Sequence, residues 1–259
     1  MLRKILLDRD VANQNHFRWR GGEISRIEGF SDAVFAFALT LLVVSLEVPE
    51  TFDQLLEAMR GFVAFGICFA LLASVWYSHY TFFRRYGLQD RYTILLNMVL
   101  LFVVLFYVYP LKFVFTLVIT QLFQYDTTVQ LANGTSVPMI EHGQTPLLFV
   151  IYSLGYMLVF LVFALLDNHA YRKRDELELS RFELFDTVTS LQGHLLDSGV
   201  GLISMLIALI GGEQYVAWAG FAYFLIAVER TIHGLLRGSR RRRMAVSYTH
   251  LTLPTILRV

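Results

Sequence analysis

The sequence is poor in cysteine and in charged residues. It holds one cysteine, Cys68, inside an apolar run, which excludes a disulfide framework and a cysteine metal cluster. Charged residues make up 17% of the chain, whereas soluble domains carry roughly 25%, so water is not the main solvent of this protein. No HExxH, GxSxG or paired-aspartate motif occurs, so we do not expect an enzyme. No small-residue cleavage site follows the first apolar run, which argues against a signal peptide.

Apolar runs of about 20 residues recur along the whole chain instead. They cover residues 30–46, 61–83, 93 to beyond Pro110, 147–166, 184–210 and 215–236. Each run is long enough to cross a hydrocarbon core roughly 30 Å thick, and helices satisfy the backbone inside lipid. Pro49 ends the first run, and Gly211-Gly212 closes the fifth. We therefore expect an all-α membrane protein with six transmembrane helices per subunit.

The cations are segregated, and their positions predict the orientation. Lys and Arg residues lie before the first run, between the second and third runs, between the fourth and fifth runs, and after the sixth run. The loops on the opposite side hold only Arg60. The positive-inside rule then places both termini in the cytoplasm. We expect a cytoplasmic segment at 1–25, a six-helix transmembrane domain at 26–238 and a basic tail at 239–244, whose arginines anchor against anionic lipid.

The last residues are set apart from the fold. The stretch Val246 to Thr255 resembles one reading frame of a transposon-end sequencing adaptor. We therefore interpret residues 245–259 as a sequencing artefact and exclude them from the reasoning about structure.

One stripe of the first run has helical spacing and mixed chemistry. Steps of four and three connect Ala33, Phe37, Thr40, Val44 and Glu47. The stripe is apolar except for one hydroxyl in its middle and one carboxylate at its outer end. Periodicity alone is compatible with an ordinary buried helix face, or with a pore lining if several copies meet around an axis.

The start of the first run carries the most specific motif. Arg26-x-x-x-Phe30-Ser31-Asp32 and the apolar residues 33–43 after it resemble the signature of the bacterial relatives of the lysosomal potassium channel TMEM175. The same pattern includes Trp76-x-x-His79-x-x-x-Phe83, Asn97 and Tyr109-Pro110. The resemblance covers residues 26 to about 112, while the last three runs match only in number and length.

The resemblance implies a homotetramer in the plasma membrane, of bacterial type, with the first helix of each subunit lining a potassium-permeable central pore. Its partners would be membrane lipid and monovalent cations, with no nucleic acid and no cofactor besides the permeant K⁺. The Thr-Val-Gly-Tyr-Gly filter of other potassium channels is absent from the sequence. Selectivity must then come from pore width, dewetting and side-chain dipoles, and should be modest.

The family's pore positions map onto the stripe described above. The hydrophobic constriction falls on Phe37, where the family usually carries Leu or Ile, so a small rotation of the helix could give this role to Leu41. Thr40 would face the ion with its hydroxyl, and Val44 would form a further apolar layer. Glu47 would concentrate cations at the outer mouth, or belong to a solvated loop.

The motif residues Arg26, Phe30, Ser31 and Asp32 are expected to support structure more than permeation. In the family such groups form an interhelical hydrogen-bond network. Trp76 and His79 at the same depth of the second run are the natural partners here.

A second class of function stays open, a proton-coupled secondary transporter that uses intramembrane ionisable groups. Asp32, His79, His194 and Asp197 are its candidates. Ser190, His194 and Asp197 lie on one face of the fifth run, where they could relay protons or make an interhelical contact. They are too few for a zinc site, which takes three or four ligands.

Overall fold

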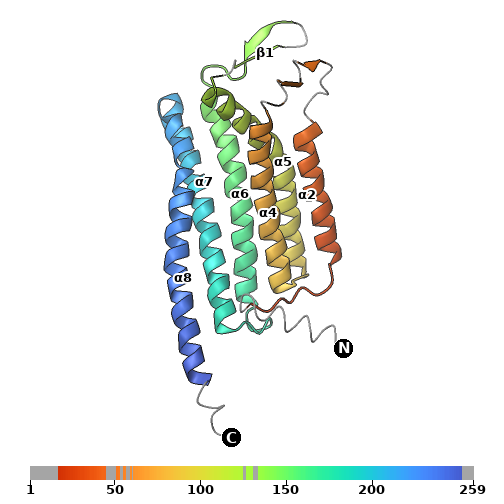
Figure 1. The fold of residues 1–259 in the computed structure, drawn as a ribbon, viewed down its shortest axis with the longest axis vertical. Coiled ribbons are helices and arrows are strands. Elements are labelled where there is room, and N and C mark those ends of the chain that lie inside the picture. The colour runs from red at the N-terminus through yellow and green to blue at the C-terminus, as the bar shows by residue number, and fades with distance from the viewer. Residues whose placement is uncertain are drawn as a thin grey trace.

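The computed structural model is mostly helical (Figure 1). It describes residues 17–44, 51–52, 55–56, 59, 61–124, 127–130 and 134–252. The helices are α2 (Arg26–Val44), α4 (Phe62–Tyr86), α5 (Arg91–Leu122), α6 (Thr145–Arg172), α7 (Arg181–Phe221) and α8 (Phe224–Thr252). Two short strands, β1 (Thr128–Gln130) and β2 (Ser136–Pro138), pair antiparallel.

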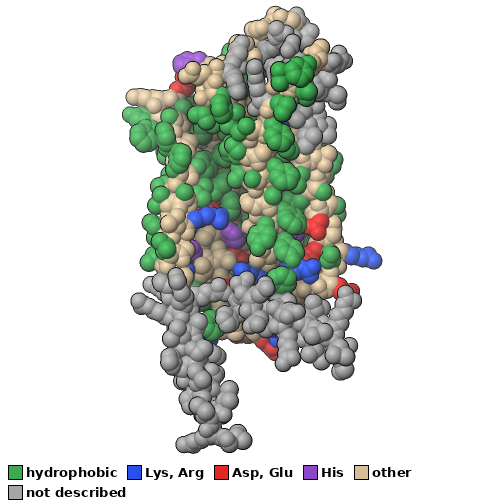
Figure 2. All heavy atoms as spheres, viewed as in Figure 1, with side chains coloured by type: hydrophobic (Ala, Val, Ile, Leu, Met, Phe, Trp, Pro, Cys, Tyr) green, Lys and Arg blue, Asp and Glu red, His purple; other side chains and the backbone are tan. Residues whose placement is uncertain are grey.

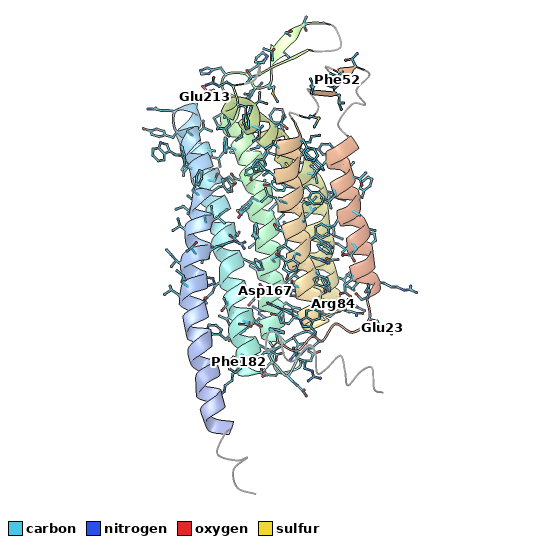
Figure 3. All side chains as sticks on the ribbon, viewed as in Figure 1. Glu23, Phe52, Arg84, Asp167, Phe182 and Glu213 are labelled. Atoms are coloured by element: carbon cyan, nitrogen blue, oxygen red, sulfur yellow. The ribbon has the colours of Figure 1, made fainter. Side chains whose placement is uncertain are left out.

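The helices lie side by side in an elongated bundle. Helix α2 forms one edge and packs against α4 and α5, α5 continues to α6, α6 packs along α7, and α8 forms the opposite edge beside α7 (Figure 1). Arg84, in the last turn of α4, lies at the lower end of the view, whereas Glu213 lies at the upper end (Figure 3). We call the lower end the basic end.

Four helical segments are long and apolar enough to span a membrane: Phe62–Tyr86, Arg91–Leu122, Thr145–Arg172 and the long segment Arg181–Gly238. The last one is not a single straight helix. Gly212 interrupts α7 with φ 55° and ψ −150°, a conformation that glycine adopts without the strain of a Cβ. The chain reverses there, and α8 returns along α7 toward the basic end (Figure 1). The prediction that Gly211-Gly212 closes a helix agrees with this reversal.

Polar caps define the helix starts at the basic end. The Asp90 carboxylate accepts hydrogen bonds from the backbone N–H groups of Tyr92 and Thr93 at the start of α5. Ser180 and Glu183 form a reciprocal capping box at the start of α7. Gly87, with φ 60°, ends α4 in the left-handed conformation.

A strap of residues 17–25 crosses the basic end before α2 begins. The Arg20 guanidinium binds Glu183 through both carboxylate oxygens, at 2.8 and 3.0 Å. The N–H groups of Arg20 and Gly21 both donate to the Arg84 carbonyl at 3.1 Å, and Phe17 is buried with an edge-on contact to Tyr86. The strap therefore joins the end of α4 to the start of α7.

Two features differ from the sequence expectations. The loop between α5 and α6, expected to be irregular within an all-α protein, contains the β1–β2 pair. Three-residue strands are too short for a periodicity signal. In addition, α8 is one helix through the predicted basic tail at 239–244 and onward to Thr252, so that boundary is not marked by a change of backbone structure.

Candidate functional site: the α2 face and its supporting contacts

Helix α2 has one buried and one exposed face. Phe35, Ala38 and Leu42 are almost fully buried against α4 and α5. On the other face Phe37 keeps 57% of its surface exposed, and Ala33 and Thr40 are exposed beside it. Because α2 lies at the edge of the bundle, this face is directed away from the subunit's own core.

Thr40 brings a polar atom to this exposed face. Its hydroxyl donates a hydrogen bond of 2.9 Å to the Ala36 carbonyl one turn earlier. A hydroxyl has one proton and two lone pairs, so the oxygen of Thr40 remains able to accept or to contact a cation. The face thus combines a large aromatic ring with an oxygen one turn away.

The other predicted pore residues are placed only in part. Leu41 is partly buried and packs against the subunit core, so Phe37, not Leu41, shares the exposed face with Thr40. Val44 is the last residue of α2, but its side chain lies outside the described part of the chain, as does all of Glu47.

A buried hydrogen-bond chain joins α2 to α5 and α4. The Asn97 amide donates to the Ser31 hydroxyl at 2.9 Å, and Ser31 donates to the Ile27 carbonyl at 2.8 Å. His79 Nε2 lies 2.9 Å from the Asn97 carbonyl oxygen, which can only accept, so in this arrangement Nε2 carries the proton. Ser31, Asn97 and His79 are each at most 1% exposed.

Asp32 and Trp76 form a second link between α2 and α4. The indole Nε1 donates to the Asp32 carboxylate at 2.8 Å, and the Trp76 ring stacks on Tyr80 with centroids 5.8 Å apart. Both residues lie at the surface of the single subunit. The two expected partners of the motif, Trp76 and His79, are therefore both in contact with it, His79 through Asn97.

Arg26 and Phe30 do not take part in these contacts. Phe30 is 53% exposed, and the Arg26 side chain is exposed with no hydrogen bond or ion pair to the described residues. The expectation that Arg26 belongs to the network is therefore not met within one chain. In its place Glu28, which is buried, closes a capping box with Ser25 at the start of α2.

The opposite end of α2 is held by a lysine. Lys112 on α5 donates its ammonium group to the Leu42 carbonyl at 2.9 Å. This carbonyl lies in the last turn of α2 as the structure describes it (Arg26–Val44). Sequence reasoning missed this contact because Lys112 lies within a long apolar run beyond Pro110, and nothing local indicates that α5 reaches the end of α2.

Two polar residues of the fifth predicted run, His194 and Asp197, form interhelical pairs. His194 Nδ1 lies 2.8 Å from the Asp167 carboxylate on α6, and Asp197 accepts a hydrogen bond of 2.7 Å from Arg230 on α8. Among the described residues no cluster of three or more His, Cys, Asp and Glu side chains could hold a metal ion. These contacts join α6, α7 and α8 rather than forming a metal centre.

Comparison with known proteins identifies the family. Residues 26–107 match the family model described as "Endosomal/lysosomal potassium channel TMEM175". A potassium channel of Marivirga tractuosa is 41% identical over 237 residues, which cover 90% of this chain and 96% of the relative. The chain belongs to the TMEM175 family. The resemblance predicted from the motif is confirmed, and because the TMEM175 relatives are channels, the expectation that the protein is not an enzyme is confirmed as well.

Solved structures of TMEM175 proteins share this fold. A crystal structure of a variant of the potassium channel MtTMEM175, in complex with a nanobody–MBP fusion protein, has 42% sequence identity and a TM-score of 0.74, and covers 88% of this chain and 98% of its own. A TMEM175 homologue from Chamaesiphon minutus, described as a lysosomal potassium-selective channel homologue, has 23% identity and a TM-score of 0.52, and covers 82% of this chain. A potassium channel of Chamaesiphon minutus is 34% identical over 96 residues, which cover 34% of this chain and 47% of the relative.

Proposed function

We propose that copies of this chain assemble as a homotetramer and conduct potassium ions through a central pore lined by α2. The face of Phe37 and Thr40 carries the proposal, because it is exposed at the edge of the bundle and belongs to the helix that bears the family motif. Four such edges around an axis bury these faces from lipid and expose them to a common conduit. Membership of a family whose relatives are named potassium channels supports the same assignment.

The pore would discriminate ions without a backbone filter. A ring of four Phe37 side chains forms a narrow apolar waist, at which hydrated ions must lose part of their water. The Thr40 oxygens, one turn further along α2, replace some of that water. Val44 and Glu47 continue the same stripe toward the outer mouth, where a carboxylate concentrates cations. Side-chain oxygens are fewer and less rigid than rings of carbonyls, so the preference for K⁺ over Na⁺ is modest.

The proposed membrane topology has six crossings. They are α2, α4, α5, α6 and the two legs of the segment Arg181–Gly238, which reverses at Gly212. The chain enters α2 and leaves α8 at the basic end, which the positive-inside rule assigns to the cytoplasm. Bacterial relatives support a location in the plasma membrane of a bacterium.

A proton-coupled transporter is disfavoured because its candidate groups are engaged in pairwise contacts. His79 binds Asn97, Asp32 binds Trp76, His194 binds Asp167, and Asp197 binds Arg230. A relay needs groups that exchange partners, whereas these contacts join neighbouring helices. The TMEM175 relatives, named as channels, do not favour it either.

Reconstituted flux tests the proposal. The purified protein in liposomes with a K⁺ gradient should pass current that reverses near the potassium equilibrium potential, with no second substrate and no pH gradient. Thr40→Ala should retain current but shift the reversal potential under mixed K⁺ and Na⁺, because the oxygen near the waist is lost. Saturating K⁺ uptake that requires a pH gradient would contradict the channel and favour the transporter.

A further inference from the structure

A cavity separate from the α2 face lies between α4, α6 and α7. Its volume is about 150 Å³. Four aromatic side chains line it. The other six lining residues are polar: Ser78, Thr81, Arg85, Asp167, Ser190 and His194. Among the described residues α4 and α7 make no backbone contact with each other, and α6 lies between them. The cavity is therefore a gap between two helices that is closed at the back by a third.

The cavity lies toward the basic end of the bundle. Figure 3 labels Asp167 in the lower part of the bundle, near the level of Arg84 at the end of α4. On the face seen in Figure 2, basic, acidic and His side chains gather in this lower part, below a surface of apolar side chains. Tyr77 on α4, which lines the cavity, is 63% exposed, and Leu195 on α7, next to the lining residue His194, is 49% exposed. The polar groups of the cavity thus lie next to exposed apolar surface, an arrangement that suits a ligand with a polar head and apolar chains.

The polar groups of the cavity offer donors more than acceptors. The Arg85 guanidinium packs over the Phe17 ring, 5.0 Å from its centroid, which orients it. Among the described residues Arg85, Thr81 and Ser190 make no side-chain hydrogen bond within the chain. A guanidinium has five N–H donors and no acceptor, and its fork matches the oxygens of a phosphate.

The one acid in the cavity does not turn it into a cation site. Asp167 is 4% exposed and is held by His194 at 2.8 Å. The Arg85 charge repels a metal ion or an ammonium group, and the described residues contain no set of metal ligands. An anion whose oxygens accept several hydrogen bonds therefore fits best.

We propose that this cavity binds the phosphate group of a membrane phospholipid, held by the Arg85 guanidinium and by the hydroxyls of Thr81 and Ser190. The acyl chains lie along the apolar surface of α4 and α7 beside the cavity. The lipid belongs to the leaflet at the basic end. This site fills the gap between α4, which supports the pore-lining helix, and the α6–α7 pair.

Native mass spectrometry of the purified, delipidated full-length assembly tests the proposal with phosphatidylglycerol as the probe. One strongly bound phosphatidylglycerol per chain is expected, and Arg85→Gln should weaken it about tenfold, the effect of losing one charge-assisted hydrogen bond. Arg85→Lys should fall between the two. Arg91→Gln is the matched control, because it removes an exposed cation at the same end but outside the cavity, and it should leave binding unchanged.

Further arms separate the sources of the phosphate and guard against misfolding. Diacylglycerol with the same chains should bind at least tenfold more weakly, and millimolar inorganic phosphate should not displace the lipid. Ser190→Leu, which fills the cavity and removes a hydroxyl while Arg85 is retained, should also abolish strong binding while the spectrum retains the native oligomer mass. Four results would overturn the proposal. Diacylglycerol could bind equally well, phosphate could displace the lipid, or Arg85→Gln and Arg91→Gln could have equal effects. In the fourth result no lipid binds, because a neighbouring subunit covers the cavity. No current is measured, so this test is independent of the channel assignment.

Discussion

At the scale of the residue, the aromatic ring of Phe37 is the least usual feature of the exposed α2 face. The TMEM175 resemblance predicts Leu or Ile at this position, and a phenylalanine is larger and flatter. A 57% exposed phenylalanine in the middle of a membrane helix is compatible with lipid, with a neighbouring subunit or with a pore, and mutation separates these possibilities.

Phe37→Ala should raise the single-channel conductance several-fold and reduce the preference for K⁺ over Na⁺, because a wider waist lets ions pass with more of their hydration shell. Planar bilayer recording under mixed K⁺ and Na⁺ measures both quantities. Phe224→Ala is the matched control, since Phe224 is 70% exposed on α8 at the opposite edge of the bundle. Equal conductance of the two variants and the parent protein would argue that Phe37 faces lipid.

Asp32 tests the supporting contacts at the same scale. Asp32→Ala leaves the Trp76 indole N–H without its acceptor. Both residues are exposed in the single subunit, so the cost there is small, whereas burial of the unpaired donor in an assembly would raise it to about 1–3 kcal/mol. We expect little or no tetramer in size-exclusion chromatography. Asp32→Asn retains an acceptor oxygen and should assemble better than Asp32→Ala. Normal yields and unaltered currents for the alanine variant would contradict this role.

Much of the residue-level site could be predicted from the sequence, but not its connections. Helical spacing predicts that Ala33, Phe37 and Thr40 share one face of the helix, and in the structure all three are exposed on the same face of α2. The bridging role of Asn97 could not be derived, because spacing along one helix says nothing about which side chain of another helix lies between Ser31 and His79. For the same reason the outward direction of Arg26 was not foreseen.

At the scale of the element, the two ends of α2 are held in different ways. The basic end is tied by side chains that reach α4 and α5, and the far end by the Lys112 ammonium group on the Leu42 carbonyl. If α2 lines a pore, both ties limit how far it can rotate.

Lys112→Met should therefore loosen the outer end of α2. Methionine cannot make the hydrogen bond that the Lys112 ammonium group donates to the Leu42 carbonyl, and we expect a loss of about 1–2 kcal/mol in the free energy of unfolding. Thermal unfolding of the purified protein, followed by tryptophan fluorescence, measures the loss. Lys112→Arg keeps the charge and a donor and should recover most of the stability. An unchanged melting temperature for Lys112→Met would rule out the proposed cap.

The start of α5 provides a test by pH. Burial raises the pKa of Asp90, but hydrogen bonds from His169 and Thr93 outweigh it and hold the pKa well below its usual range. Because the folded-state pKa is the lower one, Asp90 stabilises the fold above the unfolded pKa of about 4, and this contribution is lost as the pH falls through the folded pKa. Asp90→Asn should lower the melting temperature at pH 7 and reduce the fall in melting temperature between pH 4 and pH 2, the range over which the contribution of Asp90 is lost. An equal fall in both proteins would show that Asp90 does not contribute.

Helix positions are the best predicted part of the fold, because each long apolar run has a clear length and clear terminators. The runs at 61–83 and 147–166 correspond to α4 (Phe62–Tyr86) and α6 (Thr145–Arg172), with the additional turns supplied by polar residues at the ends. Polar ends carry no hydropathy signal, which is why the runs underestimate the helices. The strap at residues 17–25 was missed because its contacts with Arg84 and Glu183 join distant parts of the chain.

At the scale of the whole molecule, the subunit is asymmetric. One edge, α2, carries the family motif and the exposed Phe37 face, while the other edge, α8, pairs with α7 through Asp197 and Arg230. An assembly with α2 innermost places the α8 edge toward lipid. The tetramer and the count of six crossings remain predictions that this arrangement supports.

The most direct measurement is cysteine accessibility along α2 in a Cys68→Ala background, which removes the one native cysteine. Single cysteines replace Phe37 and Thr40 on the exposed face, and Ala38 and Leu42 on the buried face, and a water-soluble thiol reagent is applied during potassium flux from liposomes. We expect block in Phe37→Cys and Thr40→Cys, and none in Ala38→Cys and Leu42→Cys. Flux that persists unaltered in Phe37→Cys and Thr40→Cys would contradict a conduit lined by α2.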